Sequence, residues 1–408
     1  MWVVELFSSL PGLLAVLALF GLLGSQVRVH RAAKGDLRSL AALPRAHGIN
    51  AVLSVLVPAA ICFVGLSLVK LIGPRLNTAA LPDYVVYWTV LTVAVLGCVV
   101  AILRSTVNFR ARQASEVWIK SLLIAASVVA ILTTVGIVLS MLFEAMHFFQ
   151  QYAWQDFFFS TDWAPNFRGD SSLGFLPLLW GTFYVSFIAL ALAVPVGLFA
   201  AIYLSEYAGP WMRGIAKPLI EILAGIPTIV YGLFALVTVG PLLRDYFAQP
   251  LGLGGSASSV MTAGVVMGIM LIPFVSSLSD DAINAVPQTM RDGSYALGAT
   301  RSETVRKVIL PAALPGIMGA VLLAASRAIG ETMIVVLGAG AAAQMSLNPF
   351  EAMTTITVKI VSQLTGDTDF ASPETLVAFA LGLTLFAFTL ALNAVALLVV
   401  RKYREQYE

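Results

Sequence analysis

The chain has 408 residues, of which 59% are hydrophobic and 11% are charged, with a formal net charge of +2 and a mean hydropathy of +0.90. This composition excludes a soluble domain built around a single buried core, and it predicts an all-α polytopic membrane protein. Helices are the expected form because each backbone N–H and C=O must find its partner within the segment where no water is available.

Nine apolar segments are long enough to cross a hydrocarbon core of about 30 Å as helices. Their approximate ranges are 3–23, 50–73, 84–103, 121–143, 175–204, 218–243, 258–279, 312–338 and 376–400. Alternate connections, namely 26–49, 104–120, 205–217, 280–311 and the tail 401–408, hold 18 of the 24 Lys and Arg residues. The positive-inside rule therefore predicts a multi-pass protein of the cytoplasmic (inner) membrane with its N-terminus outside and its C-terminus inside.

Loop chemistry divides the chain into two blocks. Residues 1–115 form a three-helix membrane extension with a basic loop and no motif that indicates a role. Residues 116–408 hold six helices and nearly every residue that suggests chemistry. The start of the chain lacks the basic region and cleavage site of a removable signal peptide, so the first helix is expected to stay in the membrane. Two cysteines and three scattered histidines indicate neither a disulfide nor a metal site.

Two long outer loops, 144–174 and 341–375, differ in kind. The first is rich in aromatic residues, as expected at a membrane interface, and the second is expected to contain a short polar helix from Pro349 to Leu364. Each loop is interpreted either as a contact for an external partner or as interfacial packing and connection.

An arginine and a glutamate, Arg327 and Glu331, lie inside the apolar run from Ala312 to Gly338. Ionisable groups at membrane depth cost at least about 2.5 to 3.5 kcal/mol each, so they indicate a functional site. On a helix the two residues share one face with Cβ atoms about 5 to 6 Å apart, and Arg327 lies roughly 24 Å along the helix from Pro311. The planar donor fork of arginine matches the oxygens of phosphate, which predicts that Arg327 is a transient anion contact on a translocation path.

The roles of the neighbouring residues stay open at this point. Glu331 either holds Arg327 when no anion is present or accepts the proton that phosphate carries and sulfate lacks. Ser326 and Thr332 flank the pair as minor donors on the substrate path, although such hydroxyls usually bond back to their own backbone. Alternatively, the buried ion pair simply fixes helix packing against a partner.

The polar stretch that precedes this helix has a specific pattern. It begins with Arg291, Asp292, Gly293, Ser294, Tyr295, Ala296, Leu297, Gly298, Ala299 and Thr300. Gly298 offers a turn, a second polar segment runs from Thr300 to Lys307, and Leu310-Pro311 suits the first turn of the next span. Two short helices along the membrane surface are expected, which a soluble partner could push.

This stretch resembles the ATPase-docking loop in the membrane subunits of prokaryotic ABC importers. The family pattern is Glu-Ala-Ala, three residues, Gly, nine residues, Ile, one residue and Leu-Pro; the chain has Asp292-Gly293-Ser294, Gly298, Val308 and Leu310-Pro311. Three further segments resemble the phosphate-specific importer permeases, and the PstC type most closely, over about 121–400. They are Gly225-Ile-Pro-Thr-Ile-Val-Tyr-Gly232, Ser294-Tyr-Ala-Leu-Gly-Ala-Thr300 and Ser326-Arg-Ala-Ile-Gly-Glu-Thr-Met333.

The resemblance implies a type I ABC importer permease domain over 116–408, with 280–311 as its coupling loop. It implies import of inorganic phosphate by a heterodimer with a PstA-type permease, two copies of a PstB-type ATPase and an external phosphate-binding protein. ATP and Mg would be bound by the partner ATPase. No Gly-Lys pair occurs in the chain, so it has no phosphate-cradling loop of the form G-x-x-x-x-G-K-[ST] and is expected to be neither the hydrolytic subunit nor an enzyme. No cofactor and no nucleic acid are expected on this chain.

Three other interpretations remain at this stage. Within the same class, the substrate could be another oxyanion or small solute. A secondary transporter would normally show carboxylates or broken helices in two matching halves, whereas here one helix carries the embedded pair. A membrane signalling or scaffold subunit would need no charge pair in the membrane.

Overall fold

The computed structural model describes residues 9–33, 40–72, 82–166, 171–366 and 372–404. Within this part of the chain, nine helices are long and apolar enough to cross a membrane, as the sequence predicts. The chain forms two compact units, Met1–Val135 and Gly136–Glu408.

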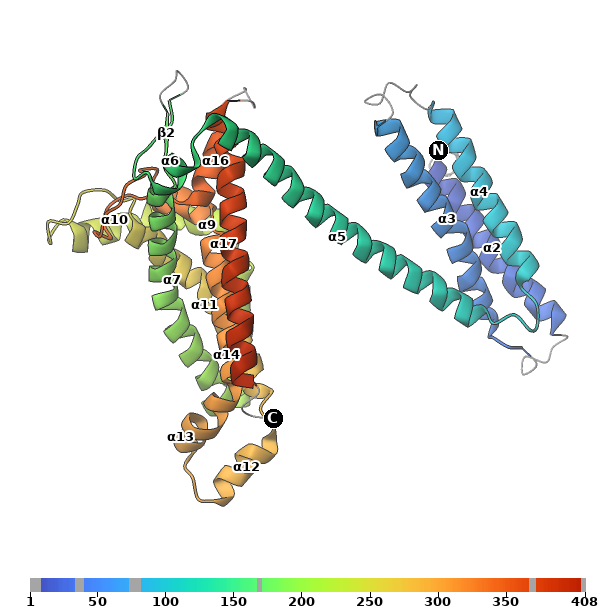
Figure 1. The fold of residues 1–408 in the computed structure, drawn as a ribbon. Coiled ribbons are helices and arrows are strands. Elements are labelled where there is room, and N and C mark those ends of the chain that lie inside the picture. Colours follow the sequence, from blue (N-terminus) through green and yellow to red (C-terminus); the bar gives the residue numbers. More distant parts are fainter. Residues whose placement is uncertain (1–8, 34–39, 73–81, 167–170, 367–371, 405–408) are drawn as a thin grey trace. The chain divides into compact units, whose positions relative to one another are not determined.

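The first unit is a bundle of antiparallel helices: α2 (Leu10–Ala32), α3 (Pro44–Ile72) and α4 (Asp83–Arg104), followed by the beginning of α5 (Ala111–Gln151) (Figure 1). Small and β-branched side chains such as Val55, Val90 and Ala94 form its core. A Cβ on Gly97 would lie 2.2 Å from the backbone oxygen of Ser54, so this glycine allows α3 and α4 to pack backbone against backbone. Helix α2 begins at Leu10 and continues to Ala32, beyond the end of the predicted first span, 3–23, whose residues 3–8 lie outside the described part of the chain.

Four long helices frame the second unit: α7 (Leu176–Ile202), α11 (Val260–Asn284), α14 (Leu310–Ile329) and α17 (Pro373–Arg404). Helix α11 is the most buried of the candidate spans and packs closely along α7. A Cβ on Gly268 would come within 3.0 Å of the Ala189 oxygen, which explains why a glycine lies at this crossing. Figure 1 shows α7, α11 and α14 running along one another.

The predicted span 218–243 is wrong as a single helix. Instead, α8 (Pro210–Ala224) ends before Pro227, and a second helical stretch follows: α9 (Thr228–Phe234), the π-helical turn η4 (Ala235–Val239), α10 (Gly240–Leu243) and the π-helical turn η5 (Arg244–Ala248). Proline disfavours helical backbone in the residue before it, so Ile226 leaves the helix and the chain restarts at Thr228. The break separates an amphipathic α8 from the spanning stretch.

The polar stretch after α11 forms α12 (Gln288–Ala296), a turn at Gly298, α13 (Arg301–Thr304) and the π-helical turn η6 (Val305–Ile309). Gly298 has a φ of +82°, which confirms the predicted turn and explains the glycine. The second expected surface helix is not separate, because α13 and η6 run directly into α14 as one helix from Arg301 to Ile329. Thr300 starts that helix with a capping box to Glu303.

The aromatic segment after α5 folds as α6 (Trp154–Phe159) and a small antiparallel sheet of β1 (Trp163–Ala164) and β2 (Ser172–Leu173). Phe148 near the end of α5 and Phe157 of α6 are completely buried, with ring centroids 5.5 Å apart, so this segment forms a packed core with the end of α5. Helix α16 (Ile356–Gly366) overlaps the short helix expected from Pro349 to Leu364 in the other long loop, but it begins and ends later.

Candidate functional site

Arg327 lies in the last turn of α14 and faces a cavity inside the second unit. Its guanidinium carbon Cζ is 4.2 Å from the centroid of the Phe274 ring on α11. Arg327 forms no ion pair with any carboxylate in the described part of the chain. A guanidinium stacked on an aromatic face keeps its in-plane N–H donors available. The arrangement therefore presents a cation whose donors are free to bind an anion.

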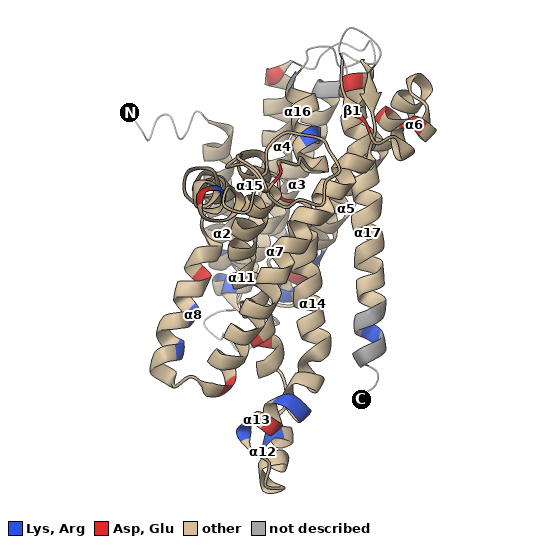
Figure 2. Ribbon diagram, turned by 90° about the vertical axis from the view of Figure 1, so that its left-hand side faces the viewer, with Lys and Arg blue, Asp and Glu red and all other residues tan. Residues whose placement is uncertain are grey.

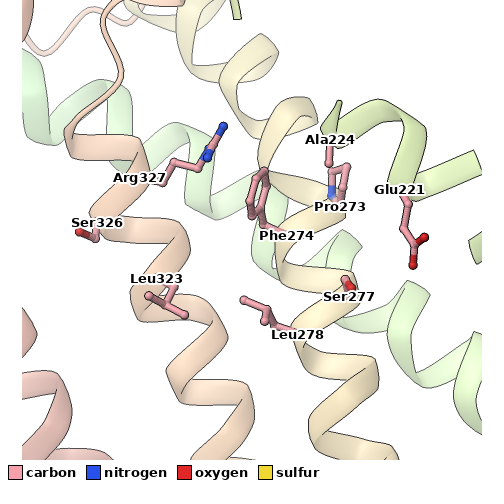
Figure 3. Close-up of a pocket in the computed structure, with 9 residues that line it drawn as sticks. All are labelled: Glu221, Ala224, Pro273, Phe274, Ser277, Leu278, Leu323, Ser326 and Arg327. Carbon is pink, nitrogen blue, oxygen red and sulfur yellow. The ribbon is translucent and has the colours of Figure 1, made fainter. Parts of the chain in front are cut away.

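The cavity has a volume of about 620 Å³ and lies between α8, α11 and α14. Figure 3 shows Arg327 and Leu323 on α14, Phe274 on α11, and Glu221 on α8 at its far side. Pro273 also lines the cavity, and because proline lacks an N–H, it removes one hydrogen bond from the middle of α11. The site thus combines one guanidinium, one carboxylate and an apolar wall.

Glu331 does not share a helix face with Arg327, which corrects the expectation of one continuous helix over 312–338. Helix α14 ends at Ile329, and α15 (Met333–Gly338) begins after a break at Gly330. Glu331 Oε1 accepts hydrogen bonds from the backbone N–H groups of Thr332 and Met333, both at 3.1 Å. These are donors that a helix start leaves unpaired, so the carboxylate satisfies the backbone of the break.

Ser326 and Thr332 take different directions from Arg327. Ser326 lines the edge of the cavity, but its hydroxyl points away from the guanidinium (Figure 3), and the residue also lines a small pocket with Thr389 and Asn393 of α17. The Thr332 hydroxyl donates to the Gly330 carbonyl at 3.4 Å, in the manner expected of a hydroxyl that bonds back to its own backbone.

Glu221 is a cavity residue that the sequence analysis missed. It forms no ion pair with the described residues and lies on α8, four positions before Gly225. A signal was available, since Glu221 falls inside the predicted span 218–243, where an ionisable residue is expensive.

Asp280, near the end of α11, links α11 to α8 through ion pairs. Its buried carboxylate accepts from Lys217 Nζ at 2.9 Å and from Arg213 Nη2 at 3.3 Å, and Asn284 Nδ2 donates to it at 2.9 Å. The hydrogen bond to Asp280 raises the pKa of Lys217 above its ordinary value of 10.5. This cluster joins the segment that carries Glu221 to the helix that carries Phe274.

The predicted coupling residues divide into an inward and an outward group. Arg291 faces inward, with Nη1 2.7 Å from Glu206 Oε1 and Nη2 donating to the Ile283 carbonyl at 2.7 Å. Ser294 is also buried, and its hydroxyl lies 2.9 Å from that of Thr304. These contacts hold α12 against η3 (Tyr203–Tyr207), the π-helical end of α7, and against α11 and α13.

The outward group forms the tip of the unit. Leu297 is 91% exposed, Tyr295 is exposed as well, and so are Asp292, Gly293, Ala296, Gly298 and Thr300, while Ala299 is half-buried. Figure 2 shows charged residues on α12 and α13, in contrast to the largely uncharged α14. Leu297 and Tyr295 are thus the exposed large hydrophobic side chains at this tip. Among the described residues, no group of three or more His, Cys, Asp or Glu could hold a metal ion.

Comparisons with known proteins identify the family of this chain. The family described as binding-protein-dependent transport system inner membrane component matches residues 193–405. The phosphate transport system permease protein PstC of Xylella fastidiosa is 32% identical over 72% of this chain and 93% of its own length. The probable ABC transporter permease protein YqgH of Bacillus subtilis is 35% identical over 57% of this chain and 74% of its own length.

A bacterial ABC transporter involved in the import of the acidic polysaccharide alginate has a similar fold. Its crystal structure superposes with a TM-score of 0.51 at 14% identity, covering 71% of this chain and 98% of that one. Proteins of this kind are transport components of the inner membrane that work with a separate ATPase and a binding protein. The chain therefore belongs to the family of binding-protein-dependent transport system inner membrane components, and within it resembles the PstC-type permeases.

Proposed function

We propose that this chain is a permease subunit of an ATP-driven importer of inorganic phosphate. The observation that carries the proposal is Arg327, a cation beside a 620 Å³ cavity in the permease unit with no carboxylate partner among the described residues. The names of its PstC relatives supply phosphate as the anion. Arginine suits a phosphate because its donor fork matches two oxygens at once.

Contact with Arg327 would be transient, which a transporter needs. Phosphate is drawn from the outer side by the guanidinium, while the carboxylate of Glu221 across the cavity disfavours a long stay of the anion. The cation–π contact with Phe274 holds the guanidinium in place between transport events. In this proposal Ser326 lies at the cavity rim, and Glu331 and Thr332 shape the chain break beside it.

The remaining subunits follow from the same proposal. A PstA-type permease completes a heterodimer, an external phosphate-binding protein delivers the substrate, and a dimer of PstB-type ATPases binds ATP and Mg. The exposed end of α12, with Leu297 at its tip, docks on one ATPase subunit. The N-terminus lies outside and the C-terminus inside, which places α12 on the cytoplasmic side as this docking requires.

Uptake of radiolabelled phosphate at low micromolar concentration tests the proposal in cells that carry the whole transporter. Arg327→Gln removes a charged hydrogen-bond donor worth about 1.5 to 3 kcal/mol, so uptake should fall at least about tenfold at matched membrane levels with the ATPase still bound. Arg244→Gln is the matched control, because Arg244 pairs with the neighbouring Asp245 away from the cavity. Normal uptake by Arg327→Gln would remove Arg327 from the path, and no phosphate uptake by the wild type would overturn the substrate.

A further inference from the structure

The first unit, which the family match does not include, has a cavity of about 380 Å³ where α4 ends. Pro58, Leu96 and Val100 contribute to an apolar wall that follows α3 and α4 into their spans. Asn50 and Arg104 contribute polar groups near the ends of the same helices. The cavity is therefore apolar along the membrane spans and polar toward the connection 105–110.

A second, open cavity on the surface of the segment 108–120 adjoins the first, because Phe109 and Ala114 line both. It adds the side chains of Arg110 and Lys120. Neither of these, nor Arg104, forms an ion pair with the described residues, and the one acidic residue that lines this cavity, Glu116, pairs with Arg112 at 3.1 Å. The joined cavities thus expose three cations that form no ion pair with a carboxylate in the described part of the chain.

Asn50 supplies an independent sign of a ligand. The residue is only 4% exposed and lines the cavity, and its side-chain oxygen Oδ1 is buried without a hydrogen-bond partner among the described residues. Buried acceptors in proteins are nearly always satisfied, so this oxygen marks a position for a donor. A ligand for these cavities must therefore carry a negative charge, a hydroxyl or similar donor, and an apolar portion.

We propose that the joined cavities bind one anionic phospholipid with a hydroxyl-bearing head group, of which phosphatidylglycerol is the simplest. Its phosphate lies among Arg104, Arg110 and Lys120, as in the basic pockets between helices that bind anionic head groups. A head-group hydroxyl donates to Asn50, and an acyl chain follows the apolar wall. That wall, which an inorganic anion could not use, argues for a lipid. The three-helix unit would then be a lipid-binding anchor of the permease.

Binding of phosphatidylglycerol to the purified, delipidated whole transporter tests this assignment, with phosphatidylcholine as the uncharged comparison. Each cation near a phosphate contributes about a fivefold change in affinity, so Arg104→Gln/Lys120→Gln should weaken phosphatidylglycerol binding roughly 25-fold and leave phosphatidylcholine binding unchanged. Arg112→Gln is the matched control in the same segment, since Arg112 pairs with Glu116 and lines neither cavity. An equal loss in both variants, or no loss in the double variant, would overturn the site.

Two further experiments test separately the role of Asn50 and the lipid nature of the ligand. Asn50→Leu should abolish the preference for phosphatidylglycerol over phosphatidic acid, which has the charge without the glycerol hydroxyls; an unchanged preference would contradict the role of Asn50. Inorganic phosphate in excess should fail to displace the lipid, and displacement would assign the cavities to a free anion. Arg104 and Lys120 are exposed, so the Arg104→Gln/Lys120→Gln variant is expected to assemble and to elute at the same volume as the wild-type complex in size exclusion. This variant therefore still decides the proposal if Asn50→Leu does not assemble.

Discussion

Removing the Arg291 guanidinium is expected to detach α12 from the second unit. The side chains of Arg291 and Glu206 are 12% and 5% exposed, with Nη1 and Oε1 2.7 Å apart. In Arg291→Met, Glu206 becomes a buried carboxylate without a cation, and the Ile283 carbonyl loses its donor. Breaking a buried pair from one side costs about 3 to 5 kcal/mol. Because these contacts hold α12 in place, we expect the loss of free energy to destabilise the packing of α12 rather than the whole unit. Helix α12 is also the element on which the ATPase is proposed to dock.

The assay compares ATP hydrolysis with phosphate uptake in the reconstituted transporter. Arg291→Met should keep ATP hydrolysis while the phosphate imported per ATP falls at least about tenfold, since 3 kcal/mol exceeds the 1.4 kcal/mol that corresponds to a factor of ten. Arg306→Met is the control, because Arg306 is exposed on η6 and has no ion pair among the described residues. Glu206→Gln/Arg291→Met should regain thermal stability relative to Arg291→Met, since no charge is left unpaired. Coupling in Arg291→Met equal to that of the control would refute the reasoning.

Three further predictions concern the same end of the molecule. Leu297→Asp should reduce co-purification of the ATPase without changing the unfolding temperature of the permease, because Leu297 is 91% exposed; full co-purification would exclude this contact. Gly298→Val should destabilise the permease by about 1 to 2 kcal/mol in thermal unfolding, because a branched side chain is strained at a φ of +82°, and Gly298→Asn should cost less. Folding raises the pKa of Lys217, so the stability that its positive charge contributes is complete at pH values below its ordinary pKa of 10.5. That stability is lost as the pH rises through the higher pKa of the folded state. Lys217→Met should therefore remove an alkaline loss of stability, and an equally steep loss in the variant would contradict the assignment.

Hydropathy predicted the number of spans but not the backbone breaks within them. Apolar residues dominate the run 312–338 on both sides of Gly330, so its mean hydropathy predicted one helix, whereas α14 ends at Ile329. The break is stable because Glu331 accepts the N–H groups of Thr332 and Met333, a local arrangement that hydropathy does not register. The helical spacing of four residues therefore indicated a pair that the backbone does not form.

Motif spacing likewise predicted the position of the coupling segment but not the direction of its side chains. Gly298 was predicted as a turn from its place between two polar segments, and the positive φ confirms it. Arg291 belongs to the same motif, yet it faces inward because Glu206, 85 positions earlier in the chain, lies opposite it. Only tertiary structure brings such distant residues together.

The contacts around α11 connect the proposed ATPase contact with the cavity. Arg291 on α12 is bonded to the Ile283 carbonyl near the end of α11, and Asp280, three residues earlier, holds Arg213 and Lys217 of α8. The next turns of α11 and α8 carry Phe274 and Glu221, which line the cavity together with Arg327. A displacement of α12 would therefore move the end of α11 at Ile283, within one turn of Asp280, whose ion pairs hold α8 in place. Because Pro273 lacks an N–H, α11 lacks one backbone hydrogen bond where it lines the cavity, so bending of α11 there would change the site beside Arg327.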